Sequence, residues 1–293
     1  MTAPGGGGRV TADPILVTGA TGPHGDAVVR ALIANGHRVL ALTRDPSSSR
    51  AARLASIGAE PVGGDLLDPQ SLAIAMTGVE AVYGVTTPFG GAGAEQEVQQ
   101  GRELIAAARQ VALPWLILAS VGSADQDTGI PHFASKGQIE RLLLDSGLPH
   151  TIVAPTYFYE NLGDPAEIAA AGELALPLPA DRPLQQVGLA DLGAVVAAVV
   201  ARRDEFLGIR LEVAADGPTP SAMAAAIADA GGSQVSYRQV PISEVANRSA
   251  DIAAMYRFLG AVGYRADSAD LRARFPELAF TSFRGWVEGA LHP

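Results

Sequence analysis

The chain has 293 residues, 48% of them apolar, enough for one large α/β domain with a smaller lobe or for two domains. Its formal net charge of −10 disfavours a non-specific nucleic-acid surface. Without cysteine, the sequence excludes disulfides, thiolate nucleophiles and cysteine-ligated metal sites. The five histidines lack the spacing of metal ligands, and no apolar stretch is as long as a membrane span. We therefore expect a soluble, cytoplasmic protein that holds no metal and binds neither nucleic acid nor membrane.

Residues 1–13 contain no apolar core of a signal peptide and are predicted to form a flexible tail. The segment that follows, 15–25, has the sequence ILVTGATGPHG. An apolar strand there runs into glycines at three-residue spacing, and a helical pattern begins at once and leads to a second strand at 39–43. This order of strand, glycine turn, helix and strand is typical of a dinucleotide-binding turn, with the pyrophosphate at the helix N-terminus. The cofactor contacts expected in the turn are Gly19, Thr21, Gly22, Pro23, His24 and Gly25.

Arg44 follows the second strand, where an acidic residue would bond the ribose of NAD and an arginine would accommodate the 2′-phosphate of NADP. Asp45 is an alternative partner for the ribose. However, Asp45 and the serines that follow it are also typical of a turn with capping residues before the next helix. We therefore favour NADP(H) over NAD(H). Asp65, after a short third strand, is predicted either to lie beside the adenine or to be a turn residue.

Further strands are predicted at 81–85 and 115–120. Ligands of open α/β sheets bind outside the carboxyl ends of the strands, so Thr86, Thr87 and Ser120 are expected to line the cofactor cleft. These elements place a doubly wound parallel Rossmann sheet over residues 14–155.

Lys136 is the only lysine among the 21 basic residues of the chain. It lies four residues after His132 on a predicted helix, so both side chains project from one helix face. A site that needs a compact ammonium does not accept arginine in its place. We therefore predict that Lys136 belongs to a site and that His132 is a candidate partner; a solvated lysine and a helix-terminal histidine are the structural alternatives.

A sixth strand at 150–154 ends at Pro155, and Tyr157, Phe158 and Tyr159 follow as one predicted wall of a pocket for a flat ligand or, alternatively, as a cover over the core. Residues 156–293 are predicted to complete the sheet and to form a small α/β lobe over the cofactor cleft. Their expected elements are helices over 189–201, 221–230, 243–263 and 282–290 and strands over 209–213 and 235–240.

Over nearly all of residues 14–291, the chain resembles the NmrA-like branch of atypical short-chain dehydrogenases/reductases. The motifs that carry the resemblance are ILVTGATGPHG, LTRDP, the GGD of residues 63–65, EQEVQQGRELIAAARQ, HFASKGQIERLLLDSGLPHTIVAPTYFYENL and MYRFLGAVGY. Such families bind NAD(P)(H) on a Rossmann sheet, and their members divide into reductases and NADPH-responsive regulators. In related reductases a tyrosine four residues before the lysine donates a proton while the lysine holds the ribose. Here His132 takes the tyrosine place, so the resemblance carries the lysine of this pair over to the chain but not the tyrosine that donates the proton.

Two functions are consistent with this resemblance. The first is an NADPH-dependent oxidoreductase that reduces a quinone, a ketone or another conjugated small molecule. Lys136 would anchor the nicotinamide ribose, Pro155 and Phe158 would contact the cofactor, and His132, Tyr157 or Tyr159 would supply a proton. The second is a non-catalytic NADP(H)-sensing regulator that signals to a protein partner. The substrate and the oligomeric state, including a homodimer, stay open.

Overall fold

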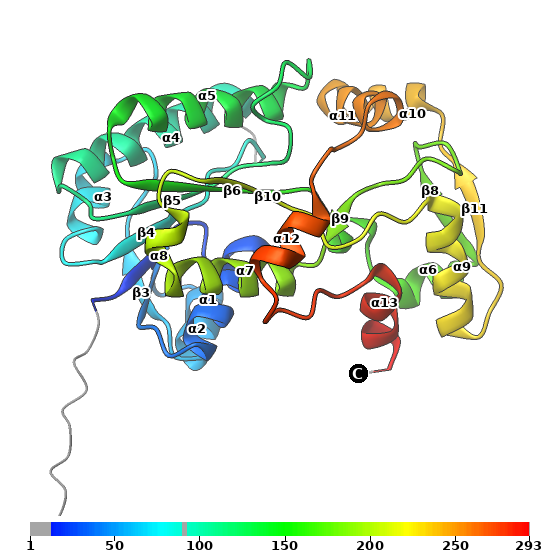
Figure 1. Cartoon of the computed structure of the whole chain (residues 1–293), viewed down its shortest axis with the longest axis horizontal. Coiled ribbons are helices and arrows are strands. Elements are labelled where there is room, and N and C mark those ends of the chain that lie inside the picture. The colour runs from blue at the N-terminus through cyan, green and yellow to red at the C-terminus, as the bar shows by residue number, and fades with distance from the viewer. Residues whose placement is uncertain (1–12, 90–92, 293) are drawn as a thin grey trace, which may run out of the picture.

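The computed structural model describes residues 13–89 and 93–292, so residues 1–12 of the predicted tail lie outside the described part. Seven of its strands share one sheet: β1 (Ile15–Val17), β2 (Val39–Thr43), β3 (Glu60–Gly63), β4 (Ala81–Gly84), β5 (Leu116–Ala119), β6 (His150–Pro155) and β10 (Arg210–Val213). All pair in parallel, in the order β10-β6-β5-β4-β1-β2-β3 (Figure 1). The order reverses at β1, which pairs with β2 on one side and β4 on the other. Sheets of this kind bind ligands at such a reversal.

Successive strand residues point to opposite faces of the sheet, and each face has its own core. Ile15 and Val17 pack into one core, and Leu16 between them packs into the other. Helices on the first face are α1 (Pro23–Ala34), α2 (Ser49–Ser56), α7 (Leu189–Ala201), α8 (Arg203–Phe206) and α12 (Ser268–Arg274). Helices on the second are α3 (Pro69–Ala75), α4 (Gly93–Gln110) and α5 (Pro131–Ser146) (Figure 1). The apolar strand runs are therefore covered on both sides, as parallel sheets require.

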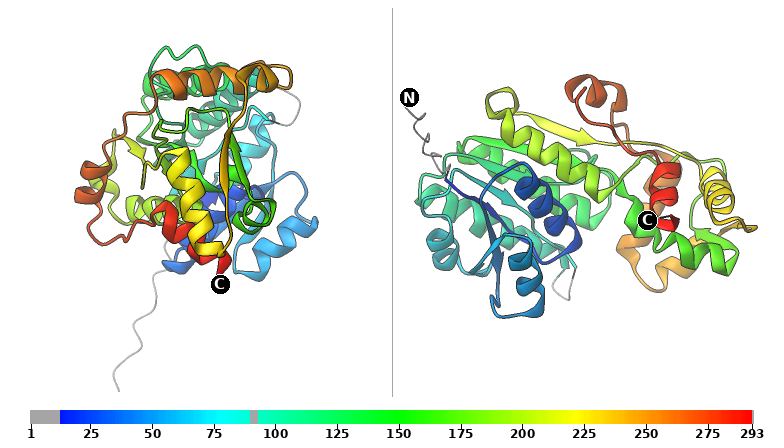
Figure 2. Two further views of the ribbon diagram at one scale, coloured as in Figure 1. Left: turned by 90° about the vertical axis from the view of Figure 1, so that its right-hand side faces the viewer. Right: turned by 90° about the horizontal axis from the view of Figure 1, so that it is seen from below.

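A third core belongs to a lobe at one end of the sheet (Figure 2). The lobe contains β7 (Tyr157–Phe158), η1 (Tyr159–Leu162), α6 (Pro165–Ala171), β8 (Glu173–Leu176), β9 (Gln186–Val187), α9 (Pro220–Gly231), β11 (Ser236–Gln239), α10 (Ile242–Ala246), α11 (Ala250–Ala261) and α13 (Phe283–Leu291). Strand β8 pairs with β11 and β7 with β9, both in parallel. Because β6 leads directly into β7, the lobe lies at the carboxyl ends of the large sheet, where a ligand would enter.

The predicted fold class, a doubly wound parallel sheet with a smaller C-terminal lobe, is confirmed. The helix predicted over 243–263 is wrong in one respect, because it is two helices, α10 and α11. Helix α10 ends at Ala246 with Asn247 as its C-cap, and Ser249 then caps α11, with its hydroxyl accepting the Ile252 N–H at 3.2 Å. Short elements such as β7, β9, α6 and α12 went unpredicted. Among the described residues, no helix is long and apolar enough to cross a membrane.

Candidate cofactor and substrate site

One cavity of about 1160 Å³ extends from the tip of β2, past the glycine turn, to helices α5 and α11. This volume exceeds the usual 300–1,000 Å³ of a small-molecule pocket, so an extended cofactor and a second molecule would fit together. The predicted site residues that line the cavity are Gly19, Thr21, Gly22, Pro23, His24, Arg44, Asp65, Thr86, Thr87, Ser120, His132, Lys136, Pro155, Tyr157 and Phe158. The structure thus brings together all but two of them. Gly25 and Tyr159 are outside this lining.

The glycine turn has the form of an anion cradle. Gly19 has φ +61°, a conformation that favours glycine, and a Cβ on Gly25 would lie 2.3 Å from the Gly19 carbonyl oxygen. Gly25 therefore serves the turn's close packing without reaching the cavity. Gly22 occupies the N-cap of α1, and since it has no side chain it leaves the first-turn N–H groups available to an anion. A dinucleotide pyrophosphate fits this arrangement of backbone donors.

Arg44 and Asp45 lie together at the far end of the cavity, but the two side chains differ in availability. The Asp45 carboxylate accepts hydrogen bonds from the Ser47 hydroxyl at 2.6 Å and from the Ser47 backbone N–H at 2.9 Å. These bonds hold the pKa of Asp45 below its usual range and keep the carboxylate within its own turn. Arg44 makes no hydrogen bond or ion pair to another described residue, which leaves its guanidinium for a ligand. Asp65 also lines the cavity, while its carboxylate accepts the Leu67 N–H at 2.9 Å.

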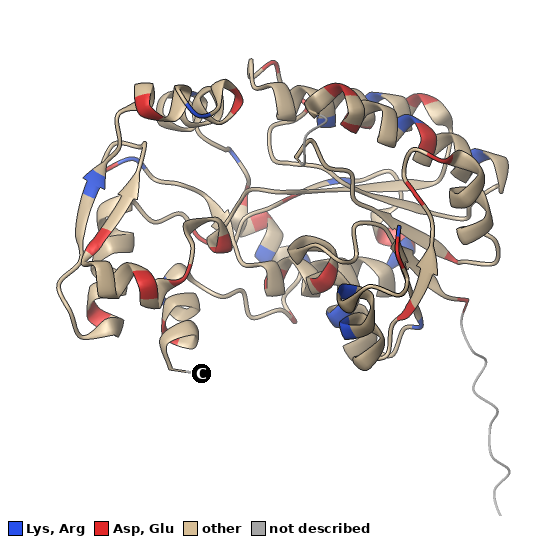
Figure 3. Ribbon diagram, turned by 180° about the vertical axis from the view of Figure 1, so that it is seen from behind, with Lys and Arg blue, Asp and Glu red and all other residues tan. Residues whose placement is uncertain are grey.

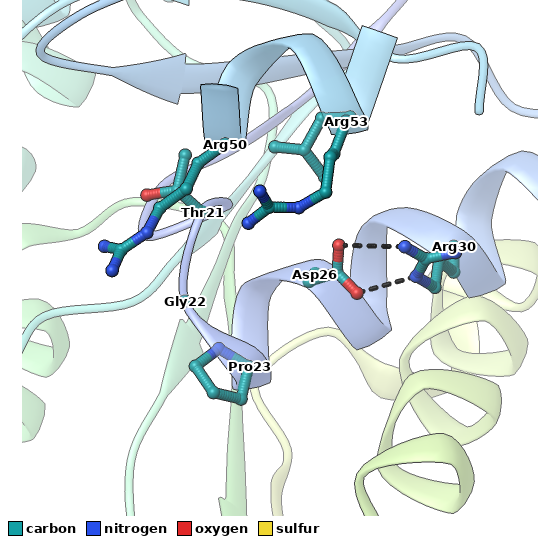
Figure 4. A pocket seen from close by; sticks show the side chains of 8 residues that line it. Thr21, Gly22, Pro23, Asp26, Arg30, Arg50 and Arg53 are labelled. Atoms are coloured by element: carbon teal, nitrogen blue, oxygen red, sulfur yellow. Dashed lines mark hydrogen bonds and ion pairs between the residues drawn. The ribbon is translucent and has the colours of Figure 1, made fainter. Parts of the chain in front are cut away.

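A smaller hollow of about 400 Å³ adjoins the turn on its outer side. Arg50 and Arg53 project from α2 towards this turn, and Arg30 is paired with Asp26 at 2.6 Å (Figure 4). Arg50 lines both the hollow and the large cavity. Sequence reasoning missed Arg50, although its position one residue into a helix that follows the Arg44 turn was a usable signal.

Lys136 is held by the carboxylate of Glu97, which is fully buried on α4. The ammonium Nζ lies 2.9 Å from Glu97 Oε1, 3.0 Å from both the carbonyl oxygen and the hydroxyl of Thr86, and 3.3 Å from the Ala119 carbonyl oxygen. The other Glu97 oxygen accepts a hydrogen bond from the Ser135 hydroxyl. Since an ammonium has only three protons, these acceptors saturate it and tie the ends of β4 and β5 to α5. A cofactor hydroxyl would have to compete with them.

His132 is paired across the site with Asp251, a residue of the lobe. Its Nδ1 lies 2.6 Å from Asp251 Oδ1, and the same oxygen lies 3.4 Å from the His132 backbone nitrogen. Rings of Phe133 and Phe89 flank the imidazole, with centroids 4.9 and 5.8 Å away. The prediction had placed His132 beside Lys136 alone; the carboxylate comes from a segment more than a hundred residues later, which periodicity does not reveal.

His24 is buried in the turn, with Nε2 2.7 Å from the Tyr83 hydroxyl and its ring edge-on to Phe158. Burial, helped by the positive charge of Lys136, lowers the pKa of His24 to about 3. The imidazole is therefore neutral and adds no charge to the cradle.

The two tyrosines after β6 differ. Tyr157 lines the cavity, and its hydroxyl lies 2.8 Å from that of Tyr256. Burial raises the pKa of both tyrosines, so neither proton is readily given up. Tyr159 is fully buried against Phe283 and donates its hydroxyl to the Thr281 carbonyl at 3.1 Å. This position corrects the prediction that Tyr159 forms part of the pocket wall or donates a proton there.

Ser120 lies at the cavity, but its hydroxyl donates to the buried Glu140, which pairs with Arg210 at 2.9 Å. The Ser120 hydroxyl therefore belongs to a hydrogen-bond network between β5, α5 and β10.

Glu97 was not predicted as a site residue from the sequence. The usable signal was its helical spacing, which puts a carboxylate on the same buried face of α4 as Gly101 and Leu104. Such a polar residue at a core position requires a partner.

Basic and acidic residues are interspersed over the described part of the chain (Figure 3). Within that part, no group of three or more histidine, aspartate or glutamate side chains is placed to hold a metal ion. The charged residues that line the large cavity include Arg44, Asp45, Arg50 and Asp65 near the tip of β2 and Lys136 on α5.

Comparison with curated proteins finds partial matches. The chain is 33% identical over 167 residues to the photosystem II assembly factor Ycf39 of Cyanophora paradoxa, covering 56% of this chain and 49% of that protein. It is 32% identical over 165 residues to the NAD(P)H azoreductase of Xenophilus azovorans, covering 56% of this chain and 55% of that one. The matches thus span about half the length of these curated relatives.

Solved structures agree over nearly the whole fold. An NADPH-dependent quinone oxidoreductase of Escherichia coli in complex with NADPH superposes with a TM-score of 0.79 at 23% identity, covering 94% of this chain and 99% of that one. The structure of the negative transcriptional regulator NmrA in complex with NADP superposes with a TM-score of 0.77 at 20% identity, covering 95% of each chain. At these identities the likeness concerns the fold. The sequence model of the NmrA-like family matches residues 11–286, and the chain therefore belongs to the NmrA-like family.

Proposed function

We propose that this protein is an NADPH-dependent oxidoreductase that reduces a quinone, a ketone or another conjugated small molecule. The observation that carries the proposal is the single cavity that connects Arg44, the glycine turn and His132. A dinucleotide laid along it would place its phosphates at the N-terminus of α1 and its nicotinamide towards α5. The azoreductase and the quinone oxidoreductase among the similar proteins support this reaction class.

Preference for NADPH follows from the adenosine end. The 2′-phosphate would meet Arg44, with Arg50 as a further cation, while the Asp45 carboxylate is occupied by Ser47. Charge-assisted hydrogen bonds between a guanidinium and a phosphate are stronger than neutral hydrogen bonds, and NAD carries only a hydroxyl in place of the 2′-phosphate.

At the other end the bound nicotinamide would supply a hydride. His132 is our candidate for the proton that completes the reduction, because it lines the cavity beside apolar and aromatic groups that exclude water. Lys136 would act mainly by holding the ends of β4 and β5 in place; its contact with the ribose stays a prediction. Quinone reduction makes the smallest demand on this site, since solvent can protonate a hydroquinone.

The second candidate is a non-catalytic NADP(H)-sensing regulator that signals to a protein partner. The saturation of Lys136 by Glu97 and Thr86 favours it, because a lysine so engaged has no donor left for catalysis. NADPH oxidation measured against a panel of quinones, aromatic ketones and azo compounds separates the two. Turnover above the rate without protein supports the reductase, whereas tight NADPH binding with no turnover on any of them supports the regulator.

A further inference from the structure

The hydrogen bond between His132 and Asp251 joins two elements that the chain separates widely. His132 is in the first turn of α5, and Asp251 is in the first turn of α11 in the lobe. The N-cap of α5 is Ile130, whose side chain cannot accept a hydrogen bond, and residue N1 is proline. The His132 N–H is therefore one of the donors that a helix start leaves unpaired, and Asp251 Oδ1 lies 3.4 Å from it. The lobe thus helps to cap the helix of the site.

Two helix N-termini lie near Asp251, because the residue belongs to the first turn of α11 and its carboxylate oxygen lies 3.4 Å from a backbone nitrogen in the first turn of α5. Both favour negative charge at this position. The same oxygen accepts from the imidazole at 2.6 Å, and Nδ1 is the nitrogen concerned. A carboxylate that stays ionised is only an acceptor, so the proton of a neutral imidazole must reside on Nδ1.

Nε2 is consequently the nitrogen left for a ligand. It has no hydrogen-bond partner in the described part of the chain, and His132 lines the cavity together with Ile252 and Tyr256 of α11. Lys136, one helical turn further along α5, is paired with Glu97 from α4, and Glu140, a turn beyond it, is paired with Arg210. Flanking rings of Phe89 and Phe133 limit the rotation of the imidazole.

We propose that Asp251 is a positioning residue, which fixes the tautomer and orientation of His132 so that Nε2 faces the substrate. This inference rests on the proposed reductase function. A carbonyl substrate would accept at carbon the hydride that NADPH supplies when bound, with oxidation of NADPH to NADP⁺; the C=O π bond opens, and the oxygen takes the Nε2 proton of the imidazolium. The ring is left neutral with its remaining proton on Nδ1, against Asp251, and solvent returns the Nε2 proton. A neutral ring in the opposite tautomer would have its acceptor nitrogen facing Asp251 and could not be recharged at the substrate side.

The test reads the tautomer directly and does not depend on turnover. Two-bond ¹H–¹⁵N correlation spectra of ¹⁵N-labelled protein at alkaline pH distinguish Nδ1–H from Nε2–H in neutral histidine, and the His132 signal is assigned by its loss in His132→Gln. We expect Nδ1–H in the wild type. In Asp251→Leu the acceptor is gone, and the signal should move to the Nε2–H form that predominates in free histidine. Glu244→Leu, an acid-to-leucine change at an exposed position of α10, is the matched control and should leave the signal unchanged.

Asp251→Ala, which suits a helix, gives the same readout if the leucine variant does not fold. Wild-type protein with Nε2–H, or variants that keep the wild-type tautomer, would overturn the proposal. In an active protein, both Asp251 variants should also lower kcat at least about tenfold with little change in the KM for NADPH, since positioned acids contribute about 10²–10⁴-fold. A tautomer shift without that fall in kcat would contradict His132 as the proton donor while supporting the positioning by Asp251.

Discussion

At the glycine turn the cavity is lined by backbone, and residues 15–25 determine its shape. At His132 and Lys136 it is lined by side chains whose partners, Asp251 and Glu97, come from other helices. The glycine turn needs only local conformation. Gly19 has a positive φ, Gly25 packs closely against the Gly19 carbonyl, and α1 begins at Gly22 without a side-chain cap. The other end of the cavity depends on the ion pair of Lys136 with Glu97 and on the hydrogen bond of His132 with Asp251, and both form only after α4, α5 and α11 have packed. Substitutions in the glycine turn should therefore lower cofactor affinity, whereas substitutions around His132 and Lys136 should lower stability and turnover.

The largest effect on stability is expected from Glu97→Leu. The change leaves the Lys136 ammonium buried without its counter-charge, and removal of one partner of a buried pair costs about 3–5 kcal/mol. Denaturant unfolding of the wild type and variant measures the loss. In Glu97→Leu combined with Lys136→Met, no charge is left unpaired, so much of the stability should return; a double variant as unstable as the sum of the two singles would contradict the coupling.

Gly22→Val should lower NADPH affinity by about 100-fold or more without unfolding the sheet. A Cβ at this position would lie 3.4 Å from the Gly19 carbonyl oxygen, an ordinary contact, so the protein can accept it. The branched side chain would, however, occupy the space of the pyrophosphate. Fluorescence titration with NADPH gives the affinity, and circular dichroism gives the fold.

Gly25→Val is the contrast within the same turn, because its Cβ would lie 2.3 Å from the Gly19 carbonyl oxygen. That variant should lower the unfolding midpoint as well as the affinity. If Gly22→Val binds NADPH as the wild type does, the phosphates do not lie at this turn.

Arg44→Ala should reduce the preference for NADPH over NADH about tenfold or more, since a charge-assisted bond contributes about 1.5–3 kcal/mol. Titration of both cofactors measures the preference. Arg38→Ala is a suitable control, because Arg38 lies before the same strand and pairs with Glu60 at the surface. Equal affinities of the wild type for the two cofactors would contradict the assignment of Arg44.

The contrast between local conformation and tertiary packing also explains which parts of the fold and of the site could be predicted from the sequence. The strands of the large sheet, the glycine turn between β1 and α1 and the doubly wound parallel arrangement depend on local patterns and on general rules of topology, and this predicted fold class is confirmed. The contacts of Lys136 and His132 depend on tertiary packing: nothing near Lys136 in the sequence points to Glu97, and nothing near His132 points to Asp251. Tyr159 was misplaced for a similar reason, since alternation after β6 does not show which aromatic side chains turn towards the lobe core.

The smallest effect is expected from Tyr157→Phe, and it decides between the candidate proton donors. The Tyr157 hydroxyl lies 2.8 Å from the Tyr256 hydroxyl, and burial raises its pKa well above the ordinary value. A raised pKa means that the proton is held more tightly near neutral pH, so this tyrosine is a poor acid in the cavity. Loss of one neutral hydrogen bond should cost about 1 kcal/mol of stability and change kcat less than about twofold. His132→Gln, assayed beside it, should lower kcat by about 10²-fold or more. If Tyr157→Phe instead shows the large loss and His132→Gln the small one, the tyrosine is the donor, and the pair of His132 with Asp251 is a structural contact between the lobe and α5.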